Sequence, residues 1–354
     1  MINRRRNANL DLLRATAILS VVIFHTLQFV DQYNPIVAKY IHLGSYGVDL
    51  FFVLSGYLIG SLYWKELKFN GFVNKIHFLL RRVLRTVPPY LAALALAYSA
   101  VFVARGEAFN WGYLIFIQNY YSQMPFFLVS WSLCVEEHFY LVVVLLLPKF
   151  ISPTNIKYNI RLLIFLSLLP LVFRALNYDL SGHGFSYYST ATHFRFEGLV
   201  LGVLIAYLHS STEFKFTTLI NHKKSALALI ALTLLLLPWA PLGITYVFGF
   251  YVVAIIFSVL LLFAVETAET VIAKSRSVKQ LAYASYSIYL THSLAIQAVL
   301  FVKENYFDLP MVVHFVMTIV FIYLVGIAFY LVVEKPTMRL RDMMVPSSKR
   351  QVYA

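Results

Sequence analysis

The first long apolar stretch of the chain, LDLLRATAILSVVIFH at 10–25, carries three ionisable side chains. His25 follows Arg14 by eleven positions, so on an α-helix both side chains lie on one face, about 16 Å apart along the axis. Asp11 precedes Arg14 by three positions and can pair with it. Guanidinium binds anions and imidazole moves protons near neutral pH, so this face is a candidate for chemistry. The alternative is an interfacial arginine and a histidine that is hydrogen-bonded to a neighbouring helix.

A second candidate is the segment WSLCVEEHFYL at 131–141, which places two adjacent carboxylates, Glu136 and Glu137, in an apolar run. Neighbouring residues on a helix point in different directions, so the two carboxylates need different partners. A buried carboxylate requires a cation or a proton, which makes one of them a candidate for orienting a histidine or balancing an arginine. A purely structural ion pair is the alternative.

A third candidate is the pair Arg82 and Arg85 in the segment RRVLRTVPPY. The spacing puts both side chains on one face of a short amphipathic helix. We expect this helix at the cytoplasmic surface, before Pro88 and Pro89 begin the next span. Guanidinium offers forked donors for phosphate. Attraction to lipid headgroups is the alternative for a basic cluster in such a place.

Further ionisable and hydroxyl side chains lie within apolar runs, where they are rare and usually face the interior of a helix bundle. Asp49 lies in GVDLFFVLSGYLIG, and an interfacial cap is its simplest interpretation. The glycines of that segment, among them Gly56, leave room for close helix approach. The remaining candidates are Arg195 and Glu197 in FRFEGLVLG, and Tyr286, Tyr289 and His292 in YSIYLTH.

The elements that must position these residues are membrane-spanning helices. The chain is 60% hydrophobic and 13% charged, whereas a soluble domain is near half apolar and a quarter charged. The apolar blocks predict an all-α polytopic membrane protein with about ten transmembrane helices. A further apolar stretch, 111–128, contains polar residues and Pro125 and is expected to be interfacial or re-entrant. The predicted spans lie at roughly 10–30, 46–64, 87–105, 129–148, 161–176, 191–208, 225–240, 247–266, 282–300 and 311–333.

The distribution of lysine and arginine predicts the orientation of these spans. With both termini in the cytoplasm, most of the 29 basic residues fall on the cytoplasmic side, as the positive-inside rule requires. The same distribution accounts for the net charge of +13, so we expect no nucleic-acid partner. We expect one membrane domain over 1–354, with a short basic cytoplasmic tail at 334–354. The basic residues that fall outside are Lys39, Arg105, Arg174, Arg195 and Lys303.

In their order and spacing, these motifs together resemble the acyltransferase 3 family of integral membrane acyltransferases, from about residue 10 to 340. The resemblance implies O-acyl transfer, most often of acetyl from cytoplasmic acetyl-CoA to a hydroxyl of a carbohydrate or glycolipid, such as a cell-envelope polysaccharide or lipopolysaccharide O-antigen. It also implies a multi-pass protein of the bacterial inner membrane. Because the chain ends at Ala354, we expect the stand-alone type without a C-terminal SGNH-like domain. The matching pieces are Arg14 with His25, GVDLFFVLSGYLI, Arg82 with Arg85, WSLCVEEHFYL, FRFEGLVLG, YSIYLTH and EKP at 334–336.

Under this resemblance we expect His25 to act as the general base on the acceptor hydroxyl. Arg82 and Arg85, with Arg14, would hold the phosphates of acetyl-CoA. An acyl-enzyme through Ser55 or Ser132 is an alternative, although no Gly-x-Ser-x-Gly elbow is present. The other expected catalytic residues are Glu136 and Glu137, as partners of His25 or of an arginine, and Arg195, Tyr289 and His292, as donors to the oxyanion.

The sequence also limits other classes of site and protein. The single cysteine, Cys134, excludes an intramolecular disulfide, and the ten histidines show no paired metal-ligand spacing, so we expect no metal. A proton-coupled transporter of a sugar or lipid-linked sugar is the main alternative to an enzyme, because buried Arg, Glu and His can form a proton relay. Many transporters contain internal repeats with paired broken helices, and no such repeat is visible here.

Overall fold

The computed structural model describes residues 7–28, 35–121, 124, 126–152, 155–178, 185–211, 216–306 and 310–346. Every regular element in these ranges is a helix, so the all-α prediction is confirmed. The chain forms two compact units, each assembled from two separate stretches. Unit 1 comprises 1–71 and 151–283, and unit 2 comprises 72–150 and 284–354. Neither unit therefore corresponds to one continuous segment of the sequence.

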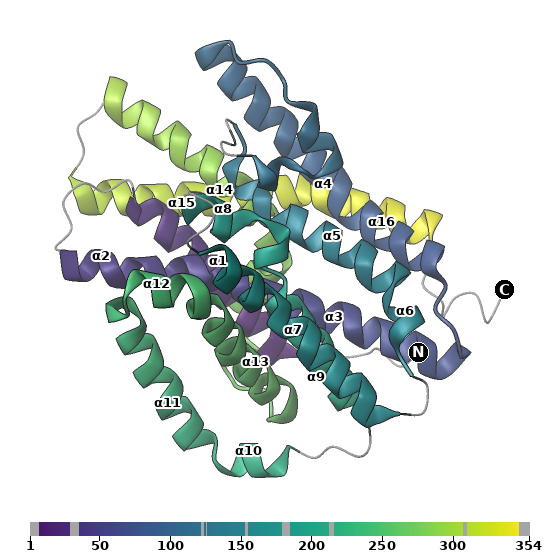
Figure 1. The fold of residues 1–354 in the computed structure, drawn as a ribbon. Coiled ribbons are helices and arrows are strands. Elements are labelled where there is room, and N and C mark those ends of the chain that lie inside the picture. The colour runs from purple at the N-terminus through teal and green to yellow at the C-terminus, as the bar shows by residue number, and fades with distance from the viewer. Residues whose placement is uncertain are drawn as a thin grey trace. The chain divides into compact units, whose positions relative to one another are not determined.

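In unit 1, α1 packs against α3 and α13, and α9 packs against α3, α7 and α13. Figure 1 shows α11 running between α10 and α12, and none of its residues is buried. The first stretch forms α1 (Ala8–Gln28), α2 (Pro35–Ile41), η1 (His42–Tyr46) and α3 (Gly47–Asn70). The second forms α7 (Ile156–Asn177), α8 (Phe185–Thr190), η5 (Thr192–Phe194), α9 (Glu197–Ser210), α10 (Thr217–Asn221), α11 (Lys223–Leu236), η6 (Leu237–Trp239), α12 (Leu242–Ile244), η7 (Thr245–Gly249) and α13 (Phe250–Glu266).

Among its described residues, unit 2 contains three long stretches of helix, at 75–105, 276–305 and 311–344, joined to shorter pieces. The segment 111–128, expected to be interfacial or re-entrant, forms short 3₁₀ turns around fully buried Gln118 and Asn119. Pro125 and residues 347–354 of the expected tail lie outside the described residues. The elements are α4 (Lys75–Arg105), η2 (Trp111–Ile115), η3 (Gln118–Tyr120), η4 (Leu128–Ser130), α5 (Trp131–Leu145), α6 (Leu147–Phe150), α14 (Arg276–Asn305, which begins in the chain of unit 1), α15 (Met311–Phe329), η8 (Tyr330–Glu334) and α16 (Lys335–Met344).

Eight of the described helices are long and apolar enough to cross a membrane, so the chain is a polytopic membrane protein. In two of the predicted spans, 191–208 and 225–240, the longest helices are the shorter α9 and α11. Each of these helices has 14 residues, a length of about 21 Å against a hydrocarbon core of about 30 Å. α9 is short because the chain before Glu197 leaves the helical path, and the carbonyl of Phe194 bonds to a side chain instead.

The contact between α3 and α9 depends on glycine, as the glycines of the segment 47–60 predict. A β-carbon on Gly56 would lie 2.0 Å from the carbonyl oxygen of Leu199. A β-carbon on Gly202 would lie 2.2 Å from the carbonyl oxygen of Val53. These separations are far below contact distance, so the two backbones can approach this closely only where the side chain is a hydrogen atom.

α4 corrects the expectation of a short amphipathic helix followed by a separate span. It is one helix of 31 residues that runs through Pro88 and Pro89. Each proline removes one backbone hydrogen bond, and membrane helices tolerate this where neighbouring groups satisfy the backbone. The hydroxyl of Tyr286 donates to the carbonyl of Thr86 at 2.7 Å, immediately before the prolines. Arg82 therefore lies on the same rigid helix as the apolar residues that follow.

The expected basic tail begins as a helix that packs on α4. α15, η8 and α16 form a continuous helical run from Met311 to Met344. The Asp342 carboxylate lies 2.9 Å from the guanidinium of Arg81. The carbonyl of Pro346 lies 2.8 Å from Nε2 of His77. These contacts hold α16 against the first turns of α4.

Candidate active site

α1 carries Asp11, Arg14 and His25 on one uninterrupted helix. Nη1 of Arg14 lies 3.6 Å from Oδ1 of Asp11, which confirms the predicted pair. His25 is half-buried, and its Nδ1 lies 3.0 Å from the carbonyl oxygen of Val21, one turn earlier. The ring of Phe24 meets the imidazole edge-on, with 4.9 Å between the centroids. Backbone and aromatic contacts therefore fix the orientation of the imidazole.

The contact with Val21 determines which nitrogen of His25 can act as a base. A carbonyl oxygen only accepts hydrogen bonds, so Nδ1 must carry a proton. In the neutral ring the lone pair then lies on Nε2. Nε2 is therefore the nitrogen of His25 that can accept a proton.

Two buried ion pairs lie where the start of α9 meets α3 and α7. Nη2 of Arg195 lies 2.8 Å from Oδ1 of Asp49, and Nη1 of Arg174 lies 2.8 Å from Oε1 of Glu197. No side chain of the four is more than 4% exposed. The ring of Phe250 packs against both guanidinium groups, at 3.8 Å from Arg195 and 5.4 Å from Arg174. The charges of the four residues cancel, which makes their burial possible.

The same arginines bind backbone carbonyls at breaks in the helices. Arg174 donates to the carbonyl of Phe194, which precedes α9, and to that of Val247 in η7 at 3.1 Å. Arg195 donates to the carbonyl of Ser189. Side-chain donors thus replace the helical hydrogen bonds that are missing at these points.

These contacts revise the interpretation of several residues. The interfacial cap expected for Asp49 is wrong, because its carboxylate is buried and paired with Arg195. The distribution of basic residues places Arg174 on the outer side, at the end of the predicted span 161–176, and in the structure its side chain is 1% exposed. In the sequence, Arg174 is an arginine near the end of an apolar block, a pattern that fits an exposed side chain as well as a buried one. The oxyanion role of Arg195 stays a prediction, and the hydrogen bonds described here join it to Asp49 and the backbone.

In unit 2, the adjacent glutamates of α5 bind different residues of α4, as their spacing predicts. Oε2 of Glu136 lies 2.9 Å from Nη2 of Arg82, and the hydroxyl of Tyr140 hydrogen-bonds to both groups. The guanidinium of Arg82 lies over the Tyr140 ring at 3.9 Å. Glu137 accepts a hydrogen bond of 2.8 Å from the hydroxyl of Thr86. Glu136 therefore balances an arginine, one of the two roles considered for it.

Arg85, one turn along α4 from Arg82, is half-buried and differently placed. Among the described residues, no hydrogen bond or ion pair within 4 Å joins its guanidinium to another side chain. Arg82, Glu334 and Arg341 are charged neighbours that act on it electrostatically. Glu334 lies in the π-helical turn η8, is 2% exposed and accepts a hydrogen bond of 2.5 Å from Ser287. Of the two predicted phosphate ligands, Arg85 thus has fewer of its N–H donors bonded to other side chains.

The predicted residues of α14 form a third polar group in unit 2. The hydroxyl of Tyr289 donates to the carbonyl of Val129 at 2.9 Å, and Oγ of Ser132 lies 2.7 Å from the same hydroxyl. His292 is fully buried, with Nδ1 2.6 Å from the carbonyl oxygen of Tyr289. Ser132 therefore bonds to a tyrosine, which is a poor base at neutral pH.

The structure places the predicted site residues in both units. Arg14, His25 and Arg195 belong to unit 1. In the ranges that the structure describes, no group of three or more His, Cys, Asp or Glu side chains is placed to hold a metal ion. Unit 2 contains Arg82, Arg85, Glu136, Glu137, Tyr289 and His292.

Comparison with known proteins places this arrangement in a family. The family described as acyltransferase domain matches residues 7–331. A protein named as a putative O-acetyltransferase from Staphylococcus aureus strain COL is 29% identical over 350 residues, which cover 88% of this chain and 54% of that protein. The O-acetyltransferase OatA of Staphylococcus aureus strain NCTC 8325 is 28% identical over 327 residues, covering 82% of this chain and 51% of that protein.

The chain therefore spans about half the length of the curated relatives it matches. No solved structure matches the chain. The family match includes His25 in α1, both glutamates of α5 and the buried ion pairs of unit 1. Because it extends over nearly the whole chain, the protein belongs to this family of membrane acyltransferases.

Proposed function

We propose that the protein is an O-acetyltransferase that moves an acetyl group from acetyl-CoA to a hydroxyl of a carbohydrate or glycolipid acceptor. Membership of the acyltransferase family supports the reaction class. The names of the relatives, O-acetyltransferases of a bacterium, support acetyl as the group transferred. The bacterial source of these relatives and the membrane-spanning helices of this chain together support the bacterial plasma membrane as the location. A cell-envelope polysaccharide or glycolipid presents the hydroxyl groups that such a reaction requires.

The observation that carries the proposal is the orientation of His25. Its Nδ1 is tied to the backbone at 3.0 Å, so Nε2 is the basic nitrogen. A general base must have its lone pair directed at the proton it removes. Half-burial in α1 keeps the imidazole partly shielded from water, and the ring stays close enough to the surface of unit 1 for a substrate to reach it.

The proposed step moves one acyl group and one proton. Nε2 of His25 accepts the proton of the acceptor hydroxyl as its oxygen attacks the thioester carbonyl. The carbon–sulfur bond then breaks, and the histidine returns the proton to the departing thiolate of coenzyme A. The products are the acetyl ester and free coenzyme A, and His25 ends in its starting state.

The donor phosphates require cations, and we propose Arg85 as the principal ligand. Its guanidinium forms no ion pair with the described residues, whereas Arg82 is already bound to Glu136 at 2.9 Å. A phosphate oxygen gains two parallel hydrogen bonds from one guanidinium. Arg82 then contributes mainly charge, because part of its donor capacity is in use.

The test is acetyl transfer by purified protein in lipid nanodiscs, with acetyl-CoA labelled in the acetyl group. His25→Ala is expected to lower the rate by about 100- to 10,000-fold, the range for loss of a general base. The matched control is His42→Ala, because His42 is exposed, also lies beside Phe24 and is the first residue of η1. Wild-type activity in His25→Ala would refute the assignment of the base.

A further inference from the structure

A reciprocal cap joins the end of α13 to the start of α1 in unit 1, and the proposed reaction does not involve it. Nδ2 of Asn9 lies 3.1 Å from the carbonyl oxygen of Ala264 and 3.3 Å from those of Thr267 and Ala268. These carbonyls lie at the last turn of α13 and just beyond it, where helical N–H donors run out. Oδ1 of Asn9 accepts from the N–H of Thr270 at 3.1 Å. One buried amide on α1 thus caps α13.

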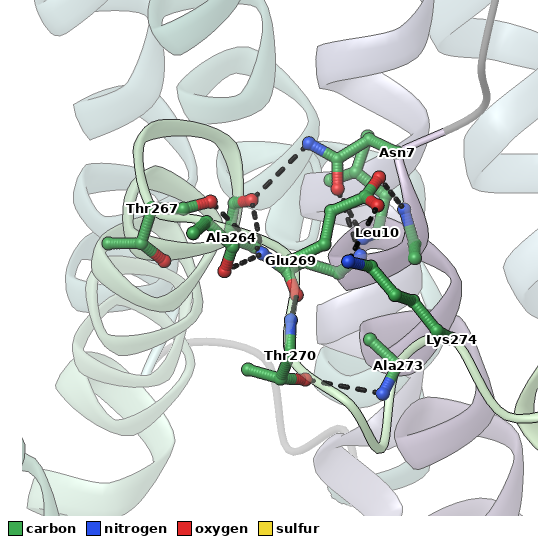
Figure 2. Close-up of polar contacts among 11 residues, drawn as sticks. Asn7, Leu10, Ala264, Thr267, Glu269, Thr270, Ala273 and Lys274 are labelled. Carbon is green, nitrogen blue, oxygen red and sulfur yellow. Dashed lines mark hydrogen bonds and ion pairs between the residues drawn. The ribbon is translucent and has the colours of Figure 1, made fainter.

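The chain that follows α13 caps α1 in return (Figure 2). Oε1 of Glu269 accepts from the N–H of Ala8, the first residue of α1, at 3.0 Å. Asn7 Oδ1 accepts from the N–H of Asn9 at 2.9 Å. Lys274 lies 3.9 Å from the other oxygen of Glu269 and steadies the carboxylate. A carboxylate at this position also opposes the positive end of the helix dipole.

These contacts differ in kind from the rest of the packing around α1. Most of the buried residues further along α1, such as Ala17, Ile18 and Val21, are apolar. Apolar contact is non-directional, so it resists separation of two helices more than it resists sliding. A slip of one residue moves a helix by about 1.5 Å along its axis, which would break the hydrogen bonds that join Ala8 and Asn9 to α13 and the chain after it.

We propose that Asn9 and Glu269 are positioning residues that set the axial register of α1 and, through it, the placement of Nε2 of His25. Arg14 and His25 follow on the same unbroken helix, so both move with its first turn. The functional part of this inference rests on the proposed role of His25 as the base. A shift of about 1 Å at a reacting group lowers a rate by about 100-fold, so the register matters to the reaction.

The first test compares single-turnover rates of acetyl transfer in nanodiscs. Glu269→Leu removes the acceptor for the N–H of Ala8 and is expected to slow transfer by about 100-fold. Glu269→Gln keeps an acceptor oxygen and should restore most of the wild-type rate. The matched control is Glu266→Leu at the end of α13, since the Glu266 carboxylate lies 2.9 Å from Nδ1 of His209 on α9.

A double variant distinguishes a role of Glu269 in positioning His25 from a role in supporting the fold. If the reciprocal cap acts through His25, then Glu269→Leu combined with His25→Ala is as slow as His25→Ala alone. A residue that merely supports the fold would add its own loss to that of His25→Ala. Asn9→Ala is expected to behave like Glu269→Leu, and the pair of glutamate variants tests the proposal if the asparagine variant does not fold.

A distance measurement tests the register independently of activity. Spin labels at Leu19 on α1 and Ile255 on α13, both exposed, report the relative position of the two helices in a Cys134→Ser background. We expect one narrow distance distribution in the wild type and in Glu269→Gln, and a shifted or broadened one in Glu269→Leu. If His25→Ala is as active as the wild type, the assignment of His25 as the base is refuted. The distance measurement would still test whether Glu269 sets the register of α1. An unchanged distribution with a wild-type rate in Glu269→Leu would overturn the proposal.

Discussion

Replacing Glu197 with glutamine should be among the most damaging single-atom changes in unit 1. Its carboxylate lies 2.8 Å from Arg174, and each side chain is 1% exposed, so water cannot screen the charge that remains. Removing one partner of a buried ion pair destabilises a protein by about 3–5 kcal/mol. The carboxyl group of Asp49 also lies 2.8 Å from Arg195 in the same buried cluster, which favours the lower end of that range. About 3 kcal/mol corresponds to a roughly 100-fold change in the unfolding equilibrium.

The chain contains a matched control for this prediction. Arg105 and Glu107 form an ion pair of 4.0 Å, in which the arginine side chain is 69% exposed. Exposed pairs of this kind contribute about 0–1 kcal/mol, so Glu107→Gln should change stability little. The assay is reversible unfolding in mixed micelles with increasing dodecyl sulfate, followed by far-ultraviolet circular dichroism. A free energy of unfolding for Glu197→Gln equal to that of Glu107→Gln would refute the structural role of the buried pairs.

Three further substitutions test other parts of the structure. Gly202→Ala places a β-carbon 2.2 Å from a backbone oxygen of α3, so it should lower the free energy of unfolding by about 1–3 kcal/mol in the same titration; an unchanged value would contradict the close crossing. Arg85→Gln should raise the dissociation constant for acetyl-CoA in nanodiscs by about 10-fold or more. The control Arg105→Gln, at an exposed arginine, should leave this constant unchanged. Equal affinity of the two variants for acetyl-CoA would refute the assignment of Arg85 to the phosphates. Tyr289→Phe removes a buried hydroxyl that bonds to Ser132 and to the backbone and should destabilise the protein by about 1–3 kcal/mol, while exposed Tyr306→Phe should be neutral.

The features that could be predicted from the sequence are local. Asp11 and Arg14 are neighbours on a helix by spacing alone, and their pair forms as expected. The different partners of Glu136 and Glu137 follow from the 100° between successive residues of a helix. Long apolar blocks predict spanning helices because a bilayer leaves the backbone few other conformations.

The features that could not be predicted depend on contacts between distant segments. Arg174 lies near the end of an apolar block, where an exposed and a buried arginine have the same sequence pattern. Its burial depends on Glu197 and on carbonyls of Phe194 and Val247, none of which belongs to its own helix. Pro88 and Pro89 predict the start of a helix, but α4 is continuous through them, and Tyr286 of α14 donates to the backbone carbonyl of Thr86 just before them. In both cases tertiary contacts override the local signal.

The most direct test of the proposed activity is binding and turnover of labelled acetyl-CoA by the wild-type protein in lipid nanodiscs, without an added acceptor. We predict saturable binding, weakened in Arg85→Gln, and slow release of free coenzyme A that disappears in His25→Ala but persists in His42→Ala. Absence of saturable binding to the wild-type protein would contradict acetyl-CoA as the donor. Binding with equal release in wild type and His25→Ala would contradict the histidine as the base.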